Sequence, residues 1–340
     1  MRVLETVCRK TGHSLKLHPV AACGESIESS YQPLPEESLA ICKQMPAVLF
    51  GNSGLEKYRR LPLDKQPEAA LMGLRKGLGV TTNIRPVKYY PQLAEFSPLK
   101  ECVLEKGLDF LFVRDIVGGI LCSDKVRSSG VGGQEAYEYE YYNEKIVLDT
   151  ARIAFQLAGG RRKKVSSLDK SNVLESSRLW RHTIQQTAES YPEILLEHYY
   201  IDNAAMRILA EPENFDVIVT SNLFGDIISD EGTQMTGTPY MYGSAELNPE
   251  MQGIYTPNQL HHPDESLIGK QAVNPCGMIA AAALMLRYTF QLEDEATLIE
   301  TAIGQVIESG YGTKDICGTN KIPLSTIEMG NRIIERVEMA

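Results

Sequence analysis

The chain has 340 residues, of which 43% are hydrophobic and 23% charged, and its 44 acidic and 34 basic side chains give a net charge of −10. This length favours two domains, and the composition excludes intrinsically disordered and collagen-like classes. The acidic balance argues against a protein devoted to nucleic acid or to an anionic membrane surface, although local arginine clusters can still bind small anions.

Hydropathy and cysteine usage indicate the cellular compartment of the protein. No stretch approaches the ~18 consecutive apolar residues of a membrane-spanning helix, and the first residues lack the apolar core of a secretion signal. The seven cysteines are scattered, with no CxxC pair, which is typical of reduced thiols. We therefore expect a cytoplasmic protein that does not bind membranes.

The first residues, 1–9, have helical spacing with no strand before them, so the chain is expected to open inside a helix, with a first parallel strand missing. Further along, short apolar runs that predict buried strands alternate with helical segments: 47–51, 108–113 and 216–220 as strands, 146–157 and the wholly apolar 278–286 as helices. This alternation favours an α/β fold with a largely parallel sheet. Residues 235–266 are rich in Gly, Pro, Asn and Thr, which predicts loops.

The sharpest chemical signal is Ser221–Asp230, directly after the strand at 216–220. If a helix begins near Asn222, Asp226 and Asp230 stand one turn apart on one face. Two such carboxylates repel each other unless a cation lies between them, and oxygen ligands suit Mg²⁺ or Mn²⁺. Taken alone, the pair fits equally an acidic helix N-terminus, which is the commoner arrangement.

Other charged residues lie at strand or helix ends. Lys170 follows a predicted strand and could act as a base, although a solvated lysine is the commoner case. Asp202 could be a third carboxylate ligand or a helix cap. Three arginines stand beside apolar or turn residues: Arg75, Arg85 and Arg114. Converging guanidinium groups would hold a dicarboxylate, but surface ion pairs explain each one alone. Leu71 and Met72, one turn before Arg75, could line that site or belong to the core.

Motifs for other chemistry are missing. The sequence contains no GxGxxG, Walker A or HExxH motif, which removes support for the dinucleotide, nucleoside-triphosphate and zinc-protease sites that those patterns mark. His261 and His262 form a weak candidate metal pair, because adjacent loop residues seldom chelate one ion.

Between about Glu68 and Gly237 the chain carries, in order, LRKGLGVTTNIRP, SPLKE, FVRDIVGGI, LDKSNVLESSRLWR, YPEILLEHYYIDNAAM and DVIVTSNLFGDIISDEGTQMTG. These motifs resemble the isocitrate and isopropylmalate family of metal-dependent β-decarboxylating dehydrogenases. The resemblance implies two α/β domains that share a cleft, residues 1–80 with 237–340 on the cofactor side and 81–236 on the substrate, metal and dimer side. It also implies NAD, Mg²⁺ or Mn²⁺, a small dicarboxylate substrate and a homodimer with an active site shared across its interface.

The resemblance assigns a role to each matching residue. Arg75, Arg85 and Arg114 would hold the malate carboxylates, and Asp226 and Asp230 would bind the metal with Asp202 of a second subunit. Lys170, also in trans, would take the 2-hydroxyl proton. The remaining matches are pocket-lining residues and cofactor-binding residues: Leu71, Met72 and Val173 for the alkyl group, and Glu68, Asp264 and Asn274 for the cofactor. The apolar pocket implies a 3-alkylmalate, isopropylmalate rather than isocitrate, and hence leucine biosynthesis.

Three departures set the chain apart from the family pattern. The opening strand with its glycine-rich turn is missing, Leu121 stands where the family has the tyrosine that protonates the enolate, and the adenosine loop is the bulkier segment 256–266. These departures leave three possible functions. The first is a working dehydrogenase in which the proton comes from water or from a nearby tyrosine, Tyr137, Tyr139, Tyr141 or Tyr142. The second is a paralog that binds a 2-hydroxy dicarboxylate and a metal without turnover, and the third is a metal-assisted decarboxylase without net oxidation.

Overall fold

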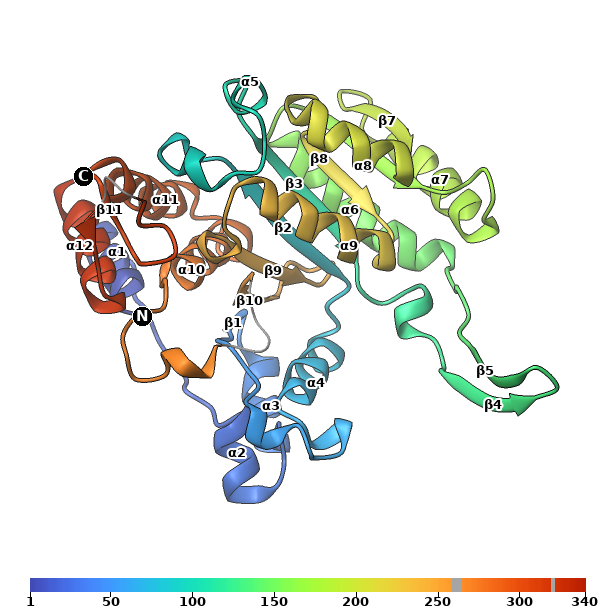
Figure 1. The fold of residues 1–340 in the computed structure, drawn as a ribbon, viewed down its shortest axis with the longest axis horizontal. Helices are drawn as coiled ribbons and strands as arrows, with labels where there is room; N and C mark the ends of the chain where they lie inside the picture. Colours follow the sequence, from blue (N-terminus) through green and yellow to red (C-terminus); the bar gives the residue numbers. More distant parts are fainter. Residues whose placement is uncertain (259–263, 319–321) are drawn as a thin grey trace. The chain divides into compact units, whose positions relative to one another are not determined.

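The computed structural model describes residues 1–258, 264–318 and 322–340. The chain divides into two compact units (Figure 1), unit 1 comprising Met1–Val80, Tyr90–Ser97 and Gly237–Ala340, and unit 2 comprising Thr81–Tyr89 and Pro98–Thr236. Segment 90–97, which the sequence analysis places with the middle of the chain, therefore lies in unit 1. The cofactor and substrate roles of the two domains stay predictions.

Unit 1 combines helices with short strands. Its helices are α1 (Arg2–Thr11), α2 (Cys23–Ser30), α3 (Glu36–Gln44), α4 (Glu68–Leu78), α10 (Cys276–Tyr288), α11 (Glu293–Glu308) and α12 (Thr326–Met339). Its strands are β1 (Ala47–Leu49), β9 (Gly243–Leu247), β10 (Gly253–Pro257), β11 (Tyr311–Gly312) and β12 (Ile322–Pro323). Short 3-10 turns complete it: η1 (Glu56–Tyr58), η2 (Leu63–Lys65), η3 (Pro91–Phe96), η6 (Pro239–Met241) and η7 (Glu265–Leu267).

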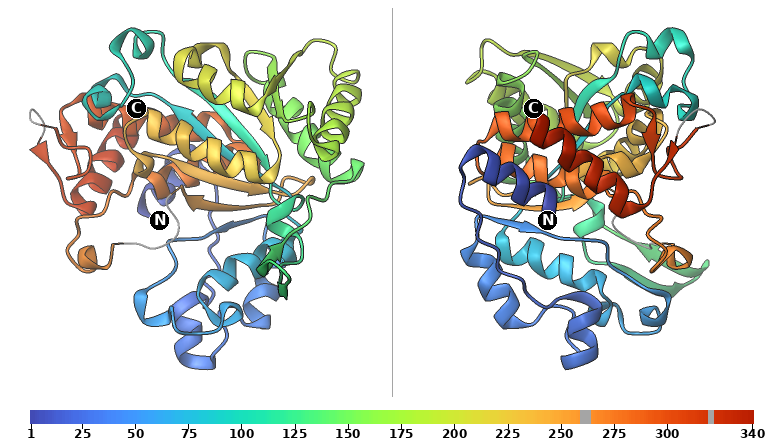
Figure 2. Two further views of the ribbon diagram at one scale, coloured as in Figure 1. Left: turned by 45° about the vertical axis from the view of Figure 1, so that its right-hand side comes forward. Right: turned by 90° about the vertical axis from the view of Figure 1, so that its left-hand side faces the viewer.

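Apolar helix faces build the core of unit 1. Helix α1 buries Val3, Leu4 and Val7 and ends where Gly12 adopts a left-handed conformation (φ 78°). It packs with α10, α11 and α12, as Figure 2 shows. The predicted buried helix at 278–286 is confirmed by α10, whose residues from Ala281 to Leu286 are all buried. The predicted strand at 47–51 is present as β1, but it is half-buried rather than buried.

The prediction of loops throughout 235–266 is wrong. Strands β9 and β10 lie inside this range and pair antiparallel, with Gly253 opposite Leu247, and β1 pairs parallel to β10. Strand β9 is buried along its whole length, its acidic residue Glu246 included. The sequence analysis did not predict this strand because most of its residues are polar or small. A strand buried on both faces also shows no alternation of polar and apolar side chains.

Unit 2 is the smaller of the two units and is an α/β layer. Its strands are β2 (Thr82–Lys88), β3 (Asp109–Asp115), β4 (Val126–Gly130), β5 (Gly133–Tyr137), β6 (Lys164–Asp169), β7 (Leu195–Tyr200) and β8 (Val217–Thr220). Its helices are α5 (Glu101–Leu104), α6 (Glu144–Gly159), α7 (Glu175–Ala188), α8 (Ile201–Ala210) and α9 (Asn222–Met235), with 3-10 turns η4 (Ile120–Cys122) and η5 (Pro212–Asn214). The predicted strands at 108–113 and 216–220 and the helix at 146–157 are confirmed by β3, β8 and α6.

The main sheet of unit 2 runs in the order β2-β3-β8-β6-β7. Strands β3, β8, β6 and β7 are parallel, whereas β2 is antiparallel to β3. Helices α8 and α9 pack together on the sheet, as do α6 and α7. Phe110 and Phe112, which point to the same side of β3, meet edge to face at 5.5 Å within the core that α8 and α9 cover.

This topology gathers polar side chains at one edge of the sheet. Arg114 lies at the carboxyl end of β3, Asn222 just beyond β8, Lys170 just beyond β6 and Asp202 just beyond β7. Parallel strands bring their carboxyl ends to the same edge, where α/β proteins bind ligands. Arg114, Lys170 and Asp202 therefore lie at one edge of the sheet, whereas Arg85 lies in the middle of β2, opposite Phe112.

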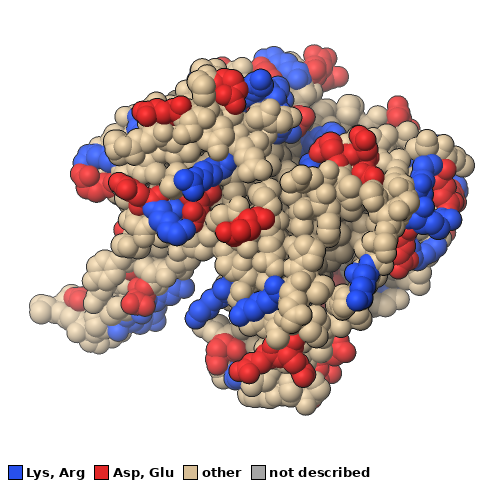
Figure 3. Space-filling model, turned by 180° about the vertical axis from the view of Figure 1, so that it is seen from behind, with Lys and Arg blue, Asp and Glu red and all other residues tan. Residues whose placement is uncertain are grey.

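Acidic and basic side chains are interspersed on the molecular face that Figure 3 shows. Among the described residues, none of the helices is long and apolar enough to cross a membrane.

Candidate active site

Helix α9 presents the two carboxylates in the way that its spacing predicts. It begins at Asn222, so Asp226 and Asp230 lie one turn apart, with side chains 48% and 69% exposed. Both are oxygen donors within reach of a ligand from solvent. The donor set suits Mg²⁺ or Mn²⁺, which prefer carboxylates and water.

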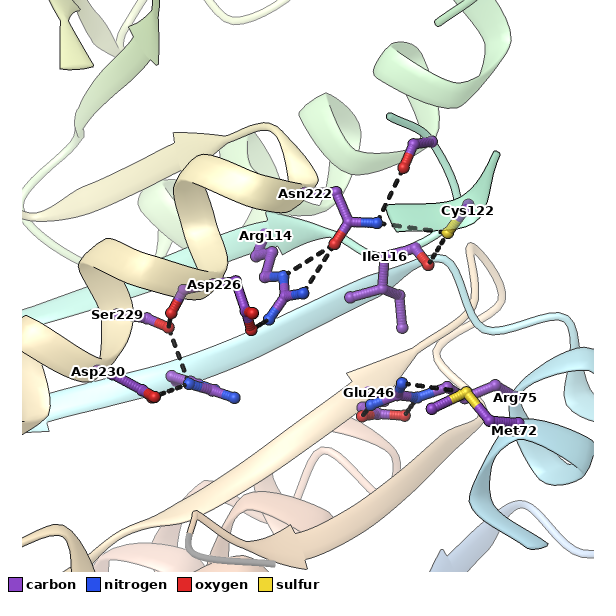
Figure 4. Close-up of polar contacts among 12 residues, drawn as sticks. Met72, Arg75, Arg114, Ile116, Cys122, Asn222, Asp226, Ser229, Asp230 and Glu246 are labelled. Carbon is purple, nitrogen blue, oxygen red and sulfur yellow. Dashed lines mark hydrogen bonds and ion pairs between the residues drawn. The ribbon is translucent and has the colours of Figure 1, made fainter. Parts of the chain in front are cut away.

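Two arginines from neighbouring strands reach these carboxylates. Arg85 of β2 donates from Nη1 to Asp230 Oδ1 and, at 2.9 Å, to Ser229 Oγ. Arg114 of β3 pairs through Nη1 with Asp226 Oδ1 (Figure 4). In the antiparallel register Arg85 lies opposite Phe112, so Arg85 and Arg114 are diagonal neighbours on one face. The structure thus brings together four of the predicted residues, two for a cation and two for carboxylates.

Asn222, a buried residue that sequence reasoning quotes within its motif but does not single out, anchors Arg114. Its Oδ1 accepts hydrogen bonds from Arg114 Nη2 at 2.8 Å and Nε at 3.2 Å. Its Nδ2 donates to the carbonyl of Gly118 at 2.8 Å and contacts Cys122 Sγ at 3.4 Å. This one amide therefore holds the guanidinium and ties the start of α9 to loop 116–122.

Gly225 allows α9 to approach β3 closely. A Cβ at this position would lie 2.6 Å from Arg114 Cγ and 2.9 Å from Thr220 Cγ2. The absence of a side chain at Gly225 therefore sets the distance between the helix that carries Asp226 and the strand that carries Arg114.

We expect Gly225→Ala to lower the free energy of unfolding by about 1–3 kcal/mol, because the added methyl must displace Arg114. Urea unfolding measures the change. Gly330→Ala is the matched control: Gly330 lies inside α12 with open space around its Cβ position, so alanine there should stabilise by about 0.5–1 kcal/mol. Equal effects of the two substitutions would contradict the close approach.

Tyr142, one of the candidate substitutes for the missing proton donor, is committed elsewhere. Its buried hydroxyl donates to Asp115 Oδ2 at 3.0 Å and accepts from the backbone N–H of Asn222 at 2.9 Å. Burial raises the pKa of Tyr142 far above its ordinary value. Burial also raises the pKa of Asp115 to about 6, opposed by hydrogen bonds from Val117, Gly118 and Tyr142. Tyr142 therefore has the role of a structural link.

The other three tyrosines, Tyr137, Tyr139 and Tyr141, are exposed. Leu121, at the family's tyrosine position, lies in η4 with 39% of its surface exposed. Cys122, the next residue, donates from Sγ to the carbonyl of Ile116 at 3.4 Å. The position where the resemblance expects a proton donor therefore carries an accessible apolar side chain beside the anchored loop.

Lys170 and Asp202, which the sequence analysis assigns to a partner's site, pair with each other in this chain. Lys170 Nζ lies 2.8 Å from Asp202 Oδ1, although the two residues follow different strands. Asp202 is the second residue of α8, so it is not the N-cap of that helix, which is Tyr200. The hydrogen bond from Lys170 lowers the pKa of Asp202. A base and a carboxylate that would both act in a partner's site are thus joined to each other.

The remaining predicted substrate residues show mixed exposure. Arg75 of α4 forms a two-point ion pair with Glu246 of β9, in which Arg75 Nε lies 2.8 Å from Glu246 Oε2 (Figure 4). Arg75 Nη1 also lies 3.7 Å from Met72 Sδ. Met72 is exposed and Leu71 fully buried. Arg75 belongs to unit 1, whereas Arg85 and Arg114 belong to unit 2. The binding of one dicarboxylate by all three arginines therefore stays a prediction. Sequence reasoning missed Glu246, since its partner lies far away in the chain.

Val173 follows Lys170 closely and is 62% exposed. Its role in lining the alkyl pocket, like the roles given to Leu71 and Met72, stays a prediction.

The predicted cofactor residues lie in unit 1. Glu68 is the first residue of α4. Asp264 accepts from the backbone N–H of Ser266 at 2.9 Å, and hydrogen bonds at Ser266 lower the pKa of Asp264. Asn274 Oδ1 accepts from Cys276 N at 2.9 Å, and its Nδ2 donates to Asp315 Oδ2 at 3.0 Å. The histidine pair 261–262 lies outside the described residues.

Within the described parts of the chain, no group of three or more His, Cys, Asp or Glu side chains is arranged to hold a metal ion. Asp226 and Asp230 fit a divalent cation by donor type, but they are two ligands. A complete protein site would therefore need a further carboxylate.

The fold and these side chains define an α/β protein in which two carboxylates of α9 pair with arginines of β2 and β3. The chain belongs to the isocitrate/isopropylmalate dehydrogenase family, which it matches over residues 1–333. It is 43% identical over 334 residues to a 3-isopropylmalate dehydrogenase of Clostridium acetobutylicum, covering 98% of this chain and 93% of that protein.

Two solved structures share the fold. The isocitrate dehydrogenase from Methylococcus capsulatus superimposes with a TM-score of 0.82 at 25% identity, covering 99% of this chain and 94% of that one. The TT0538 protein from Thermus thermophilus has a TM-score of 0.81 at 27% identity, covering 99% of this chain. The present chain spans 65% of the length of the latter. The family resemblance and the α/β fold class predicted from the sequence are confirmed.

Proposed function

We propose that the chain is a metal- and NAD-dependent dehydrogenase that oxidises and decarboxylates a 3-alkylmalate, namely 3-isopropylmalate, in leucine biosynthesis. The observation that carries this function is the pairing of Asp226 with Arg114 and of Asp230 with Arg85 on one face of the sheet. It occurs in a chain whose 43%-identical relative is named 3-isopropylmalate dehydrogenase.

The arginines bind and orient the substrate. Arg85 and Arg114 offer planar guanidinium groups from adjacent strands, a geometry that holds carboxylates through paired hydrogen bonds. Arg75 would add a third grip. Exposed Met72 and Val173 favour an apolar alkyl group, because a third substrate carboxylate placed against them would be desolvated without a partner.

Lys170, in its neutral form, takes the proton from the 2-hydroxyl oxygen as the hydride leaves carbon 2 of the substrate. The Asp202 carboxylate at 2.8 Å stabilises the ammonium that results. A divalent cation, held by Asp226 and Asp230, would supply Lewis acidity at the 2-hydroxyl oxygen, and NAD would accept the hydride. Loss of carbon dioxide from the β-keto acid leaves an enolate that must gain one proton, and Leu121 cannot supply it.

A second copy of the chain would complete the site by contributing Lys170 and Asp202. The two residues are joined within one chain, so they would enter a partner's site as a unit, and Asp202 would supply the further carboxylate. We place the reaction in the cytoplasm, a reducing compartment that suits the buried thiols of Cys8, Cys42 and Cys276.

Turnover tests the proposed function directly. Purified protein with Mn²⁺, NAD and 3-isopropylmalate should form NADH, and sedimentation should place the activity in a dimer. Metal-dependent substrate binding by calorimetry without NADH formation would favour a binding paralog. Release of carbon dioxide from the 2-keto acid without reduction of NAD would favour a decarboxylase. Activity that sediments as a monomer would contradict the shared site.

A further inference from the structure

Arg181 of helix α7 grips the residue that precedes Lys170. Its Nε donates to Asp169 Oδ2 at 2.7 Å and its Nη2 to Asp169 Oδ1 at 3.1 Å. Asp169 is buried at the end of β6, and its Oδ1 also accepts from the backbone N–H of Ser171 at 2.8 Å. The backbone is therefore held on both sides of Lys170.

The same guanidinium contacts the neighbouring strand. Its carbon lies 5.2 Å from the centre of the Tyr200 ring, within the range of a cation–π contact. Tyr200 is opposite Asp169 in the parallel register and is the N-cap of α8, two residues before Asp202. Arg181 thus touches the last residue of β6 and the last residue of β7.

Lys170 and Asp202 leave these two strand ends and meet at 2.8 Å. We propose that Arg181 is a positioning residue that sets the geometry of the Lys170–Asp202 pair by clamping the ends of β6 and β7. The expected effect of Arg181 on catalysis rests on the proposed function. The effect of Arg181 on the geometry of the Lys170–Asp202 pair does not depend on that function.

An arginine is required at this position by geometry. Two N–H groups of one planar fork bind both oxygens of Asp169 while the guanidinium carbon lies over the Tyr200 ring. A lysine supplies one compact charge and cannot make the two contacts at once. Arg181→Lys therefore keeps the charge beside the buried Asp169 but removes the two-point grip.

The kinetic test compares Arg181→Lys and Arg181→Met with the wild type. We expect kcat to fall at least ~10-fold, since misplacing a reacting group by ~1 Å costs up to ~10²-fold. The KM for 3-isopropylmalate should stay unchanged, because the clamp does not touch the arginines proposed to bind the substrate. Arg152→Met, at an exposed arginine of α6, is the control and should change neither constant. A purely structural role would lower the melting temperature and leave kcat unchanged.

A second readout does not need turnover. Acetylation by an amine reagent, quantified by mass spectrometry, should rise several-fold at Lys170 in Arg181→Lys relative to the exposed Lys43, because the amine is no longer held against Asp202. Tyr200→Leu, at a half-exposed side chain, should raise labelling in the same direction without risk to the fold. If the wild type makes no NADH, the proposed function fails while labelling still decides the clamp. Unchanged labelling in folded Arg181→Lys and Tyr200→Leu would overturn it.

Discussion

Asp226→Asn should weaken Mn²⁺ binding at least ~10²-fold while leaving the protein folded. Loss of an outer partner of a metal ligand typically costs ~10- to 100-fold in affinity, and loss of the ligand itself should cost more. Asparagine has the shape of aspartate but lacks the negative charge that a hard cation requires. Asp226 is 48% exposed, and Arg114, which is 12% exposed, keeps its two hydrogen bonds to Asn222, so the melting temperature should change little.

The substitution also separates metal binding from the position of the arginine. Asn222 holds Arg114 through two hydrogen bonds of its own, so the guanidinium keeps one anchor when the carboxylate is lost. We therefore expect the metal site to fail before the anion site does.

Calorimetry with Mn²⁺ alone measures the effect, because it requires neither substrate nor cofactor. Asp64→Asn, at an exposed carboxylate of η2 in unit 1, is the matched control and should bind Mn²⁺ as the wild type does. Equal Mn²⁺ affinity in Asp226→Asn and Asp64→Asn would show that α9 carries no metal site.

Local patterns in the sequence are sufficient to locate this helix and its strand. The apolar run before Ser221 and the four-residue spacing of the two aspartates predict β8 and one face of α9, and the structure has both. The same holds for Lys170, because β6 ends one residue earlier. These features depend on neighbours in the chain, and chain neighbours are what a single sequence displays.

Partners distant in the chain could not be predicted in this way. The pairing of Arg85 with Asp230 depends on the antiparallel register of β2 with β3 and on the close approach of α9 at Gly225. The burial of Glu246 in strand β9 could not be predicted either, because its partner Arg75 lies far away in the chain. Neither ion pair produces a pattern among neighbouring residues of the chain. The sequence analysis therefore identified Arg75 and Arg85 but not which carboxylates pair with them.

Leu121→Tyr should raise kcat by ~10²-fold or more if the missing proton donor limits turnover, since a positioned general acid contributes ~10²- to 10⁴-fold. Leu121 is 39% exposed, so a larger ring should be accommodated without displacing the core. The loop around it is anchored through Asn222 and Tyr142, so a hydroxyl attached there would be held in place.

Leu121→Phe is the matched control, because it adds the ring without the hydroxyl. Steady-state kinetics should show a gain in kcat for Leu121→Tyr alone, with the KM for 3-isopropylmalate unchanged. Equal gains in both variants would assign the effect to packing. No gain, with NAD binding shown by calorimetry, would mean that the missing proton donor does not limit turnover. The hydroxyl at position 121 is therefore a direct test of whether this chain replaced its proton donor or lost it.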